Sequence, residues 1–202
     1  MPKHKIVIAS TNKGKIREIN RVLSTFTDLK IESKSLADYL VIEPDEPYDS
    51  FLENAIHKAK YYAQHTKEAT FSDDSGFCIE ALNGFPGVYS KNFIEESGSL
   101  QEAYIRLEQR LSKTCNYTAY MHNACAIYFP QNDCLLTQEA KVHGTIAFPP
   151  RGEASFGFDP IFIPQGATKT FAELGIEEKV KISHRTNAIL GIVQKLRGVL
   201  TA

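Results

Sequence analysis

Two adjacent aspartates, Asp73 and Asp74, stand in the segment FSDDSGF (71–77), directly after an apolar run. One interpretation is a turn, because Asp, Ser and Gly are ordinary turn residues. The other is a metal site, because Mg²⁺ binds one or two carboxylates together with waters and substrate phosphates. Adjacent strand residues face opposite sides of a sheet, so both aspartates can face one site only where the strand ends. We therefore predict a strand end at residues 73–74.

Other carboxylates that could complete such a site lie in the acidic, proline-broken segment VIEPDEPYD (41–49) and at Asp159. The prolines predict a loop over residues 41–49. The acids that this loop offers are Glu43, Asp45 and Glu46. Because Mg²⁺ usually keeps several waters, one of these acids and one aspartate of the pair are enough to hold it.

The segment STNKGK (10–15), between a predicted strand and a predicted helix, indicates phosphate binding. The unpaired N–H groups and the positive dipole end of a helix start suit an anion. Three cations crowd this helix start: Lys13, Lys15 and Arg17. Each cation there is unfavourable by about 0.3–1 kcal/mol, and a bound anion would offset that cost. The alternative is simple helix capping, for which the usual residue types are also present at Ser10, Thr11 and Asn12.

The same pattern recurs before the last predicted helix. Ser183 is a natural cap there, and His184 and Arg185 occupy the first turn, with Lys179 just upstream. These cations again stand at the unfavourable end of a helix. A solvated basic patch is the alternative interpretation.

Two further motifs are ambiguous when taken alone. Lys58 lies one turn after Asn54 on the polar face of a predicted helix, where a single lysine is usually solvated. In FGFDP, Phe156 and Phe158 flank Gly157 in a predicted loop. These rings could stack on a purine base, although core packing explains an isolated phenylalanine equally well.

The elements that must position these residues alternate between strand and helix, which favours an α/β fold. A short apolar run predicts a strand at KIVIAS (5–10), and Ser50 and Glu53 have the spacing of a capping box before a helix. Two segments rich in aromatic and branched residues predict an antiparallel pair, joined by the turn PQNDC (130–134). The remaining helices are predicted over residues 16–26, 99–111 and 182–200 from apolar residues at helical spacing.

Composition limits the class of protein. The chain has 202 residues, 43% of them hydrophobic, and a net charge of −1, as in a soluble globular protein that binds neither membranes nor nucleic-acid polymers. Its four cysteines form no C-x-x-C pair, so we expect reduced, mostly buried thiols in a cytoplasmic protein: Cys78, Cys115, Cys125 and Cys134. His122 and Cys125 are expected inside a strand rather than around a metal. No stretch has the length of a membrane span or of a signal-peptide core.

The order of the motifs is more specific than any one of them. ASTNKGK (9–15), FLENAIHKA (51–59), SDDSGF…ALNGFPGVYS (72–90), FGFDPIFIP…TFAEL (156–174) and EEKVKISHR (177–185) follow one another along nearly the whole chain. This series resembles the noncanonical purine nucleoside triphosphate pyrophosphatases, the inosine/xanthosine triphosphate pyrophosphatase family. The resemblance implies one domain over residues 1–202, with two lobes around a long mixed sheet and the active site in the cleft between the lobes.

The same resemblance implies a Mg²⁺-dependent homodimer that hydrolyses ITP, dITP and XTP to the monophosphate and pyrophosphate. It assigns Asp74 as general base and metal ligand, with Glu46 as the second ligand. The triphosphate would be held by Ser10, Thr11, Asn12, Lys13, Gly14, Lys15, Lys58 and Ser75. The base pocket would comprise Phe156, Gly157, Phe158, Asp159, Lys179, His184 and Arg185. The chain departs from the family pattern at Asn83-Gly84-Phe85-Pro86, where Gly-Gly is usual before Pro-Gly, and at Lys91-Asn92, where a small residue and an arginine are usual.

Chemistry suggests how a 6-oxo purine is selected. An arginine has only donors, so Arg185 with His184 would accept the C6 oxygen of hypoxanthine and leave the amine of adenine facing a donor. Two alternatives stay open. One is a Maf-like pyrophosphatase for pyrimidine nucleotides, against which the FGFDP and SHR motifs argue; the other is a nucleotide sensor without catalysis.

Overall fold

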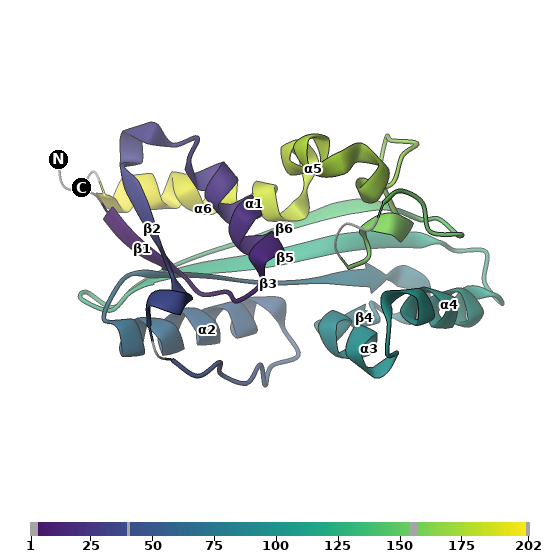
Figure 1. The fold of residues 1–202 in the computed structure, drawn as a ribbon, viewed down its shortest axis with the longest axis horizontal. Helices are drawn as coiled ribbons and strands as arrows, with labels where there is room; N and C mark the ends of the chain where they lie inside the picture. The colour runs from purple at the N-terminus through teal and green to yellow at the C-terminus, as the bar shows by residue number, and fades with distance from the viewer. Residues whose placement is uncertain (1–3, 40, 154–156, 201–202) are drawn as a thin grey trace. The chain divides into compact units, whose positions relative to one another are not determined.

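A mixed sheet of seven strands organises the protein, as a computed structural model shows for residues 4–39, 41–153 and 157–200. Six strands follow the order β2-β1-β3-β5-β6-β7, and β4 pairs with β3. The strands are β1 (His4–Ile8), β2 (Ile31–Ser35), β3 (Thr70–Ile79), β4 (Pro86–Gly87), β5 (Thr118–Phe129), β6 (Cys134–Ile146) and β7 (Phe162–Pro164). The helices are α1 (Lys13–Leu23), α2 (Phe51–Thr66), α3 (Ser90–Glu96), α4 (Leu100–Leu111), α5 (Phe171–Ile182) and α6 (His184–Leu200). The predicted α/β class with a mixed sheet is confirmed (Figure 1).

The chain divides into two compact units. Unit 1 comprises residues 1–74, 123–140 and 185–202, and unit 2 comprises residues 75–122 and 141–184. In unit 1, β1 pairs in parallel with both β2 and β3, as expected where helices cover the faces of a sheet. Helices α1 and α6 lie on one face of these strands and α2 lies on the other (Figure 1).

Helix α2 shows why this sequence builds unit 1. Ser50 Oγ accepts a hydrogen bond from the backbone N–H of Glu53, which satisfies one of the free donors at the helix start. Its small residues Ala55, Ala59 and Ala63 are fully buried against the sheet. Burial of this face, rather than helix propensity alone, holds α2 in place.

Unit 2 is built around an aromatic core. Phe77, Phe158, Phe162 and Phe171 are all buried, and the rings of Phe77 and Phe158 stack with centroids 4.9 Å apart. Offset stacking of this kind adds to the free energy gained from burying the rings.

Helix α5 of unit 2 begins with a complete capping box. Thr170 Oγ1 accepts from the N–H of Glu173, and the Glu173 carboxylate accepts from the N–H of Thr170. This helix was not predicted, although the Thr-x-x-Glu spacing is visible in the sequence. Helix α3 and strand β2 were also not predicted.

Most of the predicted elements are confirmed with shifted ends. The helix predicted over 16–26 is α1, which begins three residues earlier and ends at Leu23. Strands β5 and β6 are neighbours joined by residues 130–133, a connection too short for a parallel crossover, so they form the predicted antiparallel pair.

Two predictions about buried residues need correction. Lys58, expected on an exposed helix face, is only 6% exposed. The cysteines are all free, but only Cys78 and Cys125 are buried, whereas Cys134 is half-buried and Cys115 is exposed. Cys125 lies in β5, as expected, and its thiol donates to the Gln138 carbonyl at 3.4 Å. Among the described residues, no helix is both long and apolar enough to cross a membrane.

The predicted strand end at residues 73–74 is wrong. Strand β3 continues through both aspartates and through Ser75 and Gly76 to Ile79. Burial overrides the turn propensity of the residues in DDSG, because nearly all residues of β3 are buried. The two aspartates therefore cannot share one site on one face.

Candidate active site

Asp73 and Asp74 have separate sets of partners, as their places in an unbroken strand require. Asp73 is 2% exposed and Asp74 is 6% exposed. The amide of Asn123 links the two positions, because its Nδ2 donates to Asp73 Oδ2 and to the backbone carbonyl of Asp74. We call the two groups the Asp73 cluster (Lys15, Glu18, Asp73, Asn123 and Arg185) and the Asp74 cluster (Glu46, Asn54, Lys58 and Asp74).

In the Asp73 cluster, three donors converge on the single oxygen Asp73 Oδ2. Arg185 Nε lies 3.1 Å from it, Asn123 Nδ2 lies 2.8 Å from it, and Lys15 Nζ lies 3.3 Å from it. Arg185 also donates through Nη1 to Glu18 Oε2. The donors come from α1, β5 and α6, so one carboxylate ties three separate elements together.

This arrangement keeps Asp73 ionised. Burial alone would raise the pKa of Asp73, but the charges of Lys15 and Arg185 outweigh it and hold that pKa well below the ordinary value. Burial lowers the pKa of Lys15, and the Asp73 carboxylate partly offsets this effect. Cations at the starts of two helices were expected to need a bound anion. For Lys15 of α1 and Arg185 of α6, the protein itself supplies that anion, the Asp73 carboxylate.

In the Asp74 cluster, contacts to the aspartate are longer. Lys58 Nζ lies 3.4 Å from Asp74 Oδ1, and Asn54 Nδ2 lies 3.4 Å from Asp74 Oδ2. Lys58 also donates to Glu46 Oε1. Asn54 pins the loop before α2, because it exchanges hydrogen bonds of 3.0 and 2.9 Å with the backbone of Tyr48. The structure thus brings together Glu46, Lys58 and Asp74, three residues that the family resemblance assigns to the site.

The electrostatics of this cluster suit a base. Burial raises the pKa of Asp74, and the nearby Lys58 only partly counters this effect. For Lys58 the balance is the reverse: burial would lower its pKa, but Asp74 and Glu46 raise it on balance, so the lysine stays charged. A carboxylate of raised pKa beside a fixed cation can accept a proton and remain close to a phosphate charge.

The donor set fits a magnesium ion. Glu46 is 37% exposed at its side chain and Asp74 is nearly buried, and both carboxylates already surround one cationic group, Lys58 Nζ. Mg²⁺ needs only one or two carboxylates when substrate phosphates and waters supply the other ligands. Among the described residues, no group of three or more His, Cys, Asp or Glu residues is arranged for a metal.

The segment of residues 10–15 caps helix α1. Asn12 Oδ1 accepts from the backbone N–H groups of Gly14 and Lys15 at 2.9 and 3.1 Å, and Ser10 Oγ accepts from Asn12 N. The capping interpretation is therefore confirmed for Asn12. Thr11, Asn12 and Lys13 are exposed, so the segment is also open to a ligand.

A second group of predicted residues lies in unit 2. Lys179 Nζ donates to Asp159 Oδ2 at 2.7 Å, and both side chains are buried. The carbonyl of Gly157, whose φ is +54°, accepts from the Tyr104 hydroxyl at 2.5 Å. Phe158 packs into the aromatic core of the unit, so for this ring the core-packing interpretation holds.

The remaining predicted residues belong to different elements. Ser75 follows Asp74 in β3 and is half-buried, and His184 is buried at the start of α6. Arg185 belongs to the Asp73 cluster. Phe156 lies outside the described residues.

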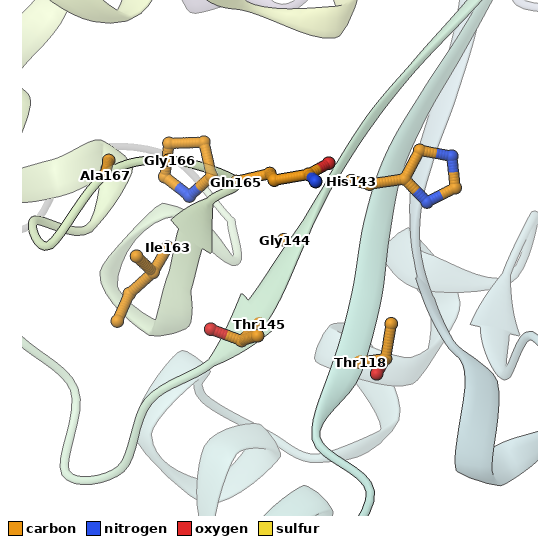
Figure 2. Close-up of a pocket in the computed structure, with 9 residues that line it drawn as sticks. Thr118, His143, Gly144, Thr145, Ile163, Gln165, Gly166 and Ala167 are labelled. Atoms are coloured by element: carbon orange, nitrogen blue, oxygen red, sulfur yellow. The ribbon is translucent and has the colours of Figure 1, made fainter.

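A hollow of 470 Å³ lies in unit 2 (Figure 2), and none of the predicted site residues is among those that line it. Its lining residues come from β5, β6 and the segment around the end of β7: Thr118, His143, Gly144, Thr145, Ile163, Pro164, Gln165, Gly166 and Ala167. None of these is Lys, Arg, Asp or Glu. A polyphosphate needs several fixed donors or cations, so this hollow does not fit one.

Comparison with known proteins supplies the family. A profile of the Ham1 family matches residues 6–195. The chain belongs to the Ham1 family. It is 38% identical to a dITP/XTP pyrophosphatase of Zymomonas mobilis, over 91% of this chain and 88% of that one. It is 39% identical to a dITP/XTP pyrophosphatase of Aquifex aeolicus, over 96% of both chains.

Solved structures of Ham1 proteins share the fold. A HAM1 protein from Coxiella burnetii superposes with a TM-score of 0.88 at 33% identity, over 96% of this chain and 99% of that one. A nucleoside-triphosphatase, dITP/XTP pyrophosphatase, from Mycobacterium abscessus superposes with a TM-score of 0.75 at 36% identity, over 94% and 98% of the chains. The resemblance on which the sequence interpretation relied is thereby confirmed.

Sequence reasoning missed two residues of the two clusters, Glu18 and Asn123, and misjudged the surroundings of a third, Asn54. Glu18 lies three residues after Lys15 in α1, and the burial of this charged side chain is not visible from the sequence. Asn123 is a polar residue in the apolar run of β5, which is a detectable signal for a buried hydrogen bond. Asn54 was placed correctly beside Lys58, but on a face that was expected to be solvated.

Proposed function

We propose that this Ham1-family chain is a nucleoside triphosphate pyrophosphatase that hydrolyses deaminated purine nucleotides, ITP, dITP and XTP, to the monophosphate and pyrophosphate. The observation that carries the proposal is the convergence of Asp74, Glu46 and Lys58 in a chain whose relatives are named dITP/XTP pyrophosphatases. Such an activity removes damaged nucleotides before they enter DNA or RNA.

Asp74 is the general base of the proposed reaction. Its carboxylate takes a proton from a water molecule, whose oxygen forms a bond to the α-phosphorus. The bond between the α-phosphorus and the bridging oxygen then breaks, and pyrophosphate leaves with the electron pair. The raised pKa of Asp74 supports this role, since a stronger base removes the proton more readily.

Glu46 and Asp74 would hold Mg²⁺, which when bound neutralises phosphate charge and lowers the pKa of water. The chain itself contributes Lys58, whose charge is kept by its two carboxylate neighbours. Glu46 is the more exposed of the two acids, so it can turn toward a metal without uncovering the buried part of the cluster.

The triphosphate would be bound by the start of α1 and its neighbours. Backbone N–H groups at a helix start and the ammonium groups of Lys13 and Lys15 favour an anion. Ser10, Thr11, Asn12, Gly14, Lys58 and Ser75 complete the proposed contacts. Because Thr11, Asn12 and Lys13 are exposed, a phosphate can reach them without rearrangement of the core.

The purine would be recognised by residues of unit 2. Lys179 and Asp159 form an adjacent donor and acceptor pair, which matches the C6 oxygen and the N1–H of hypoxanthine or xanthine. Adenine presents the reverse order, an amine donor at C6 and an acceptor at N1. Gly157, Phe158 and His184 would shape this pocket, and Phe156 stays a predicted contact. A homodimer and a cytoplasmic location also stay predictions.

The test is pyrophosphate release from ITP, dITP, XTP, GTP, ATP and dTTP in the presence of Mg²⁺. We expect turnover of the first three nucleotides to exceed that of GTP and ATP. Preference for dTTP would replace the proposal with a pyrimidine-nucleotide pyrophosphatase. Nucleotide binding without pyrophosphate release would replace it with a sensor.

A further inference from the structure

Tyr104 brings a hydroxyl into the apolar core of unit 2. It is 5% exposed and belongs to the buried face of α4, together with Ala103, Leu107 and Leu111. A hydroxyl buried without a hydrogen-bond partner costs free energy that a phenylalanine at the same place would not cost. The partner of this hydroxyl is the backbone carbonyl of Gly157, 53 residues further along the chain.

This hydrogen bond fixes a peptide group that the local sequence leaves free. Gly157 has a φ of +54°, and glycine is permissive enough that it does not by itself select one orientation of the peptide group that joins it to Phe158. The Tyr104 hydroxyl lies 2.5 Å from the Gly157 carbonyl oxygen. Because a peptide group is planar, a contact that holds this oxygen sets the direction of the whole group.

The hydroxyl of Tyr104 keeps its proton at physiological pH. Burial raises the pKa of Tyr104 to about 12, and the negative charge of Asp159 adds to this effect. A carbonyl oxygen can only accept, so the tyrosine is the donor of this hydrogen bond.

The residues after Gly157 lead directly to the proposed base-recognition pair. The ring of Phe158 stacks on Phe77 with centroids 4.9 Å apart and meets the ring of Tyr104 edge-on at 6.4 Å. Asp159 comes next and accepts from Lys179 Nζ at 2.7 Å. Tyr104 therefore contacts both of the residues that precede the carboxylate of this pair, one through its hydroxyl and one through its ring.

We propose that Tyr104 is a positioning residue for purine recognition, whose hydroxyl holds the Gly157 carbonyl and thereby sets where Asp159 and Lys179 present their acceptor and donor. The role is indirect, because the buried hydroxyl is engaged by the backbone and acts on the nucleotide through its neighbours. This inference rests on the proposed function, since it concerns the part of that site which recognises the base.

Tyr104→Phe tests the hydroxyl, because it keeps the ring and its contact with Phe158. We expect KM for ITP to rise about fivefold with kcat changed less than about twofold, as for one lost hydrogen bond that supports binding. Adenine presents the reverse order of donor and acceptor and gains little from the placement of the pair. The value of kcat/KM for ATP should therefore change by less than about twofold, so that the ratio of ITP to ATP falls.

Inorganic tripolyphosphate separates positioning of the base from a general structural effect, because it has phosphates but no base. Its affinity, measured by calorimetry, should be the same for the wild-type protein and Tyr104→Phe. Tyr128→Phe is the matched control, because Tyr128 is also a buried tyrosine and its hydroxyl donates to Asp133 at 2.9 Å, in unit 1. This control should leave both the ratio of ITP to ATP and the affinity for tripolyphosphate unchanged.

Two results would overturn the positioning role. One is an unchanged ratio of ITP to ATP in Tyr104→Phe, and the other is an equal loss for ITP, ATP and tripolyphosphate, which would show a structural effect. Thermal unfolding checks that the variant folds. If it does not, Tyr104→Met gives the same readouts, because the flexible methionine fills the core without a hydroxyl.

The outcomes also separate this inference from the proposed function. A wild-type protein that releases no pyrophosphate from any nucleotide would overturn both. A wild-type enzyme with the expected substrates, but with an unchanged ratio of ITP to ATP in Tyr104→Phe, would overturn only the role of Tyr104.

Discussion

The Asp73 cluster and the Asp74 cluster begin from the same residue type at consecutive positions of one strand, yet they differ in almost every property. Asp73 has three donors on one oxygen, and its pKa is held low. Asp74 has two contacts of 3.4 Å, and burial raises its pKa. One carboxylate is saturated by the protein and the other is left with capacity for a proton or a ligand.

The difference teaches how a single strand can separate stability from chemistry. Because side chains alternate along β3, a step of one residue moves a carboxylate from one set of helices to another. The Asp73 side faces α1 and α6, whose first turns supply cations. The Asp74 side faces α2, whose lysine is shared with an exposed acid.

Asp74→Asn should have the largest effect, and this effect should be a loss of catalysis without a loss of stability. The amide cannot accept a proton, so we expect kcat to fall about a thousandfold, within the usual range for a lost general base. The free energy of unfolding should change by less than about 1 kcal/mol, because the contacts of Asp74 are long and Lys58 keeps Glu46. Pyrophosphate release and chemical denaturation measure the two quantities; a large loss of stability would contradict the division of roles.

Asp73→Asn should show the opposite pattern. Lys15 and Arg185 would lose their shared counter-ion in a buried place, so we expect unfolding to become easier by about 3 kcal/mol. Asp28→Asn is the control, because the exposed pair of Asp28 with Arg197 should contribute less than about 1 kcal/mol. Urea denaturation of both variants tests this, and equal stability of the two would show that the Asp73 cluster holds nothing together.

Glu46→Gln tests whether the Asp74 cluster binds magnesium. If Glu46 is a magnesium ligand, the Mg²⁺ concentration for half-maximal activity should rise about tenfold, as one of two carboxylates is lost. Glu43→Gln, a change in the same exposed loop, should leave the magnesium dependence unchanged. A magnesium titration of activity measures both, and identical curves would remove Glu46 from the metal site.

The smallest effect is in the pH dependence of stability, measured with EDTA. The stabilisation from Asp73, whose folded pKa is lowered, is present above the pKa of about 3.9 of an unfolded aspartate and is lost as the pH falls further. For Asp74, whose folded pKa is raised, the contribution is present below about pH 3.9 and is lost as the pH rises through the folded pKa. Plots of the stability difference from Asp73→Asn and from Asp74→Asn against pH should therefore slope in opposite directions. Parallel slopes would contradict the comparison.

The sequence indicated which charged residues matter, but it did not show that Lys15 and Arg185 pair with Asp73. Cations at the starts of α1 and α6 were visible, and their cost suggested a bound anion. The structure supplies Asp73 as that anion. Which carboxylate lies near two helix starts depends on contacts across more than a hundred residues, and such contacts leave no local pattern.

Local signals were reliable where local physics decides the structure. The Ser50 cap at the start of α2 and the long β5–β6 pair were predicted from local sequence patterns. Local signals failed at DDSG, where burial within β3 overrides turn propensity. The exposure of Lys58 was misjudged for a related reason, since a lysine becomes buried only when carboxylates from other segments meet it.

The contact between Arg185 and Glu18 spans 167 positions of the chain, and that between Arg185 and Asp73 spans 112. During synthesis the segment from β1 to β3, which carries Lys15, Asp73 and Asp74, is made long before α6. A nascent chain thus carries Glu46, Lys58 and Asp74 while the buried Asp73 carboxylate still lacks one of its two cations. We expect the enzyme to mature abruptly, when its last helix docks, so that incomplete translation products neither bind nor consume the nucleotide pool.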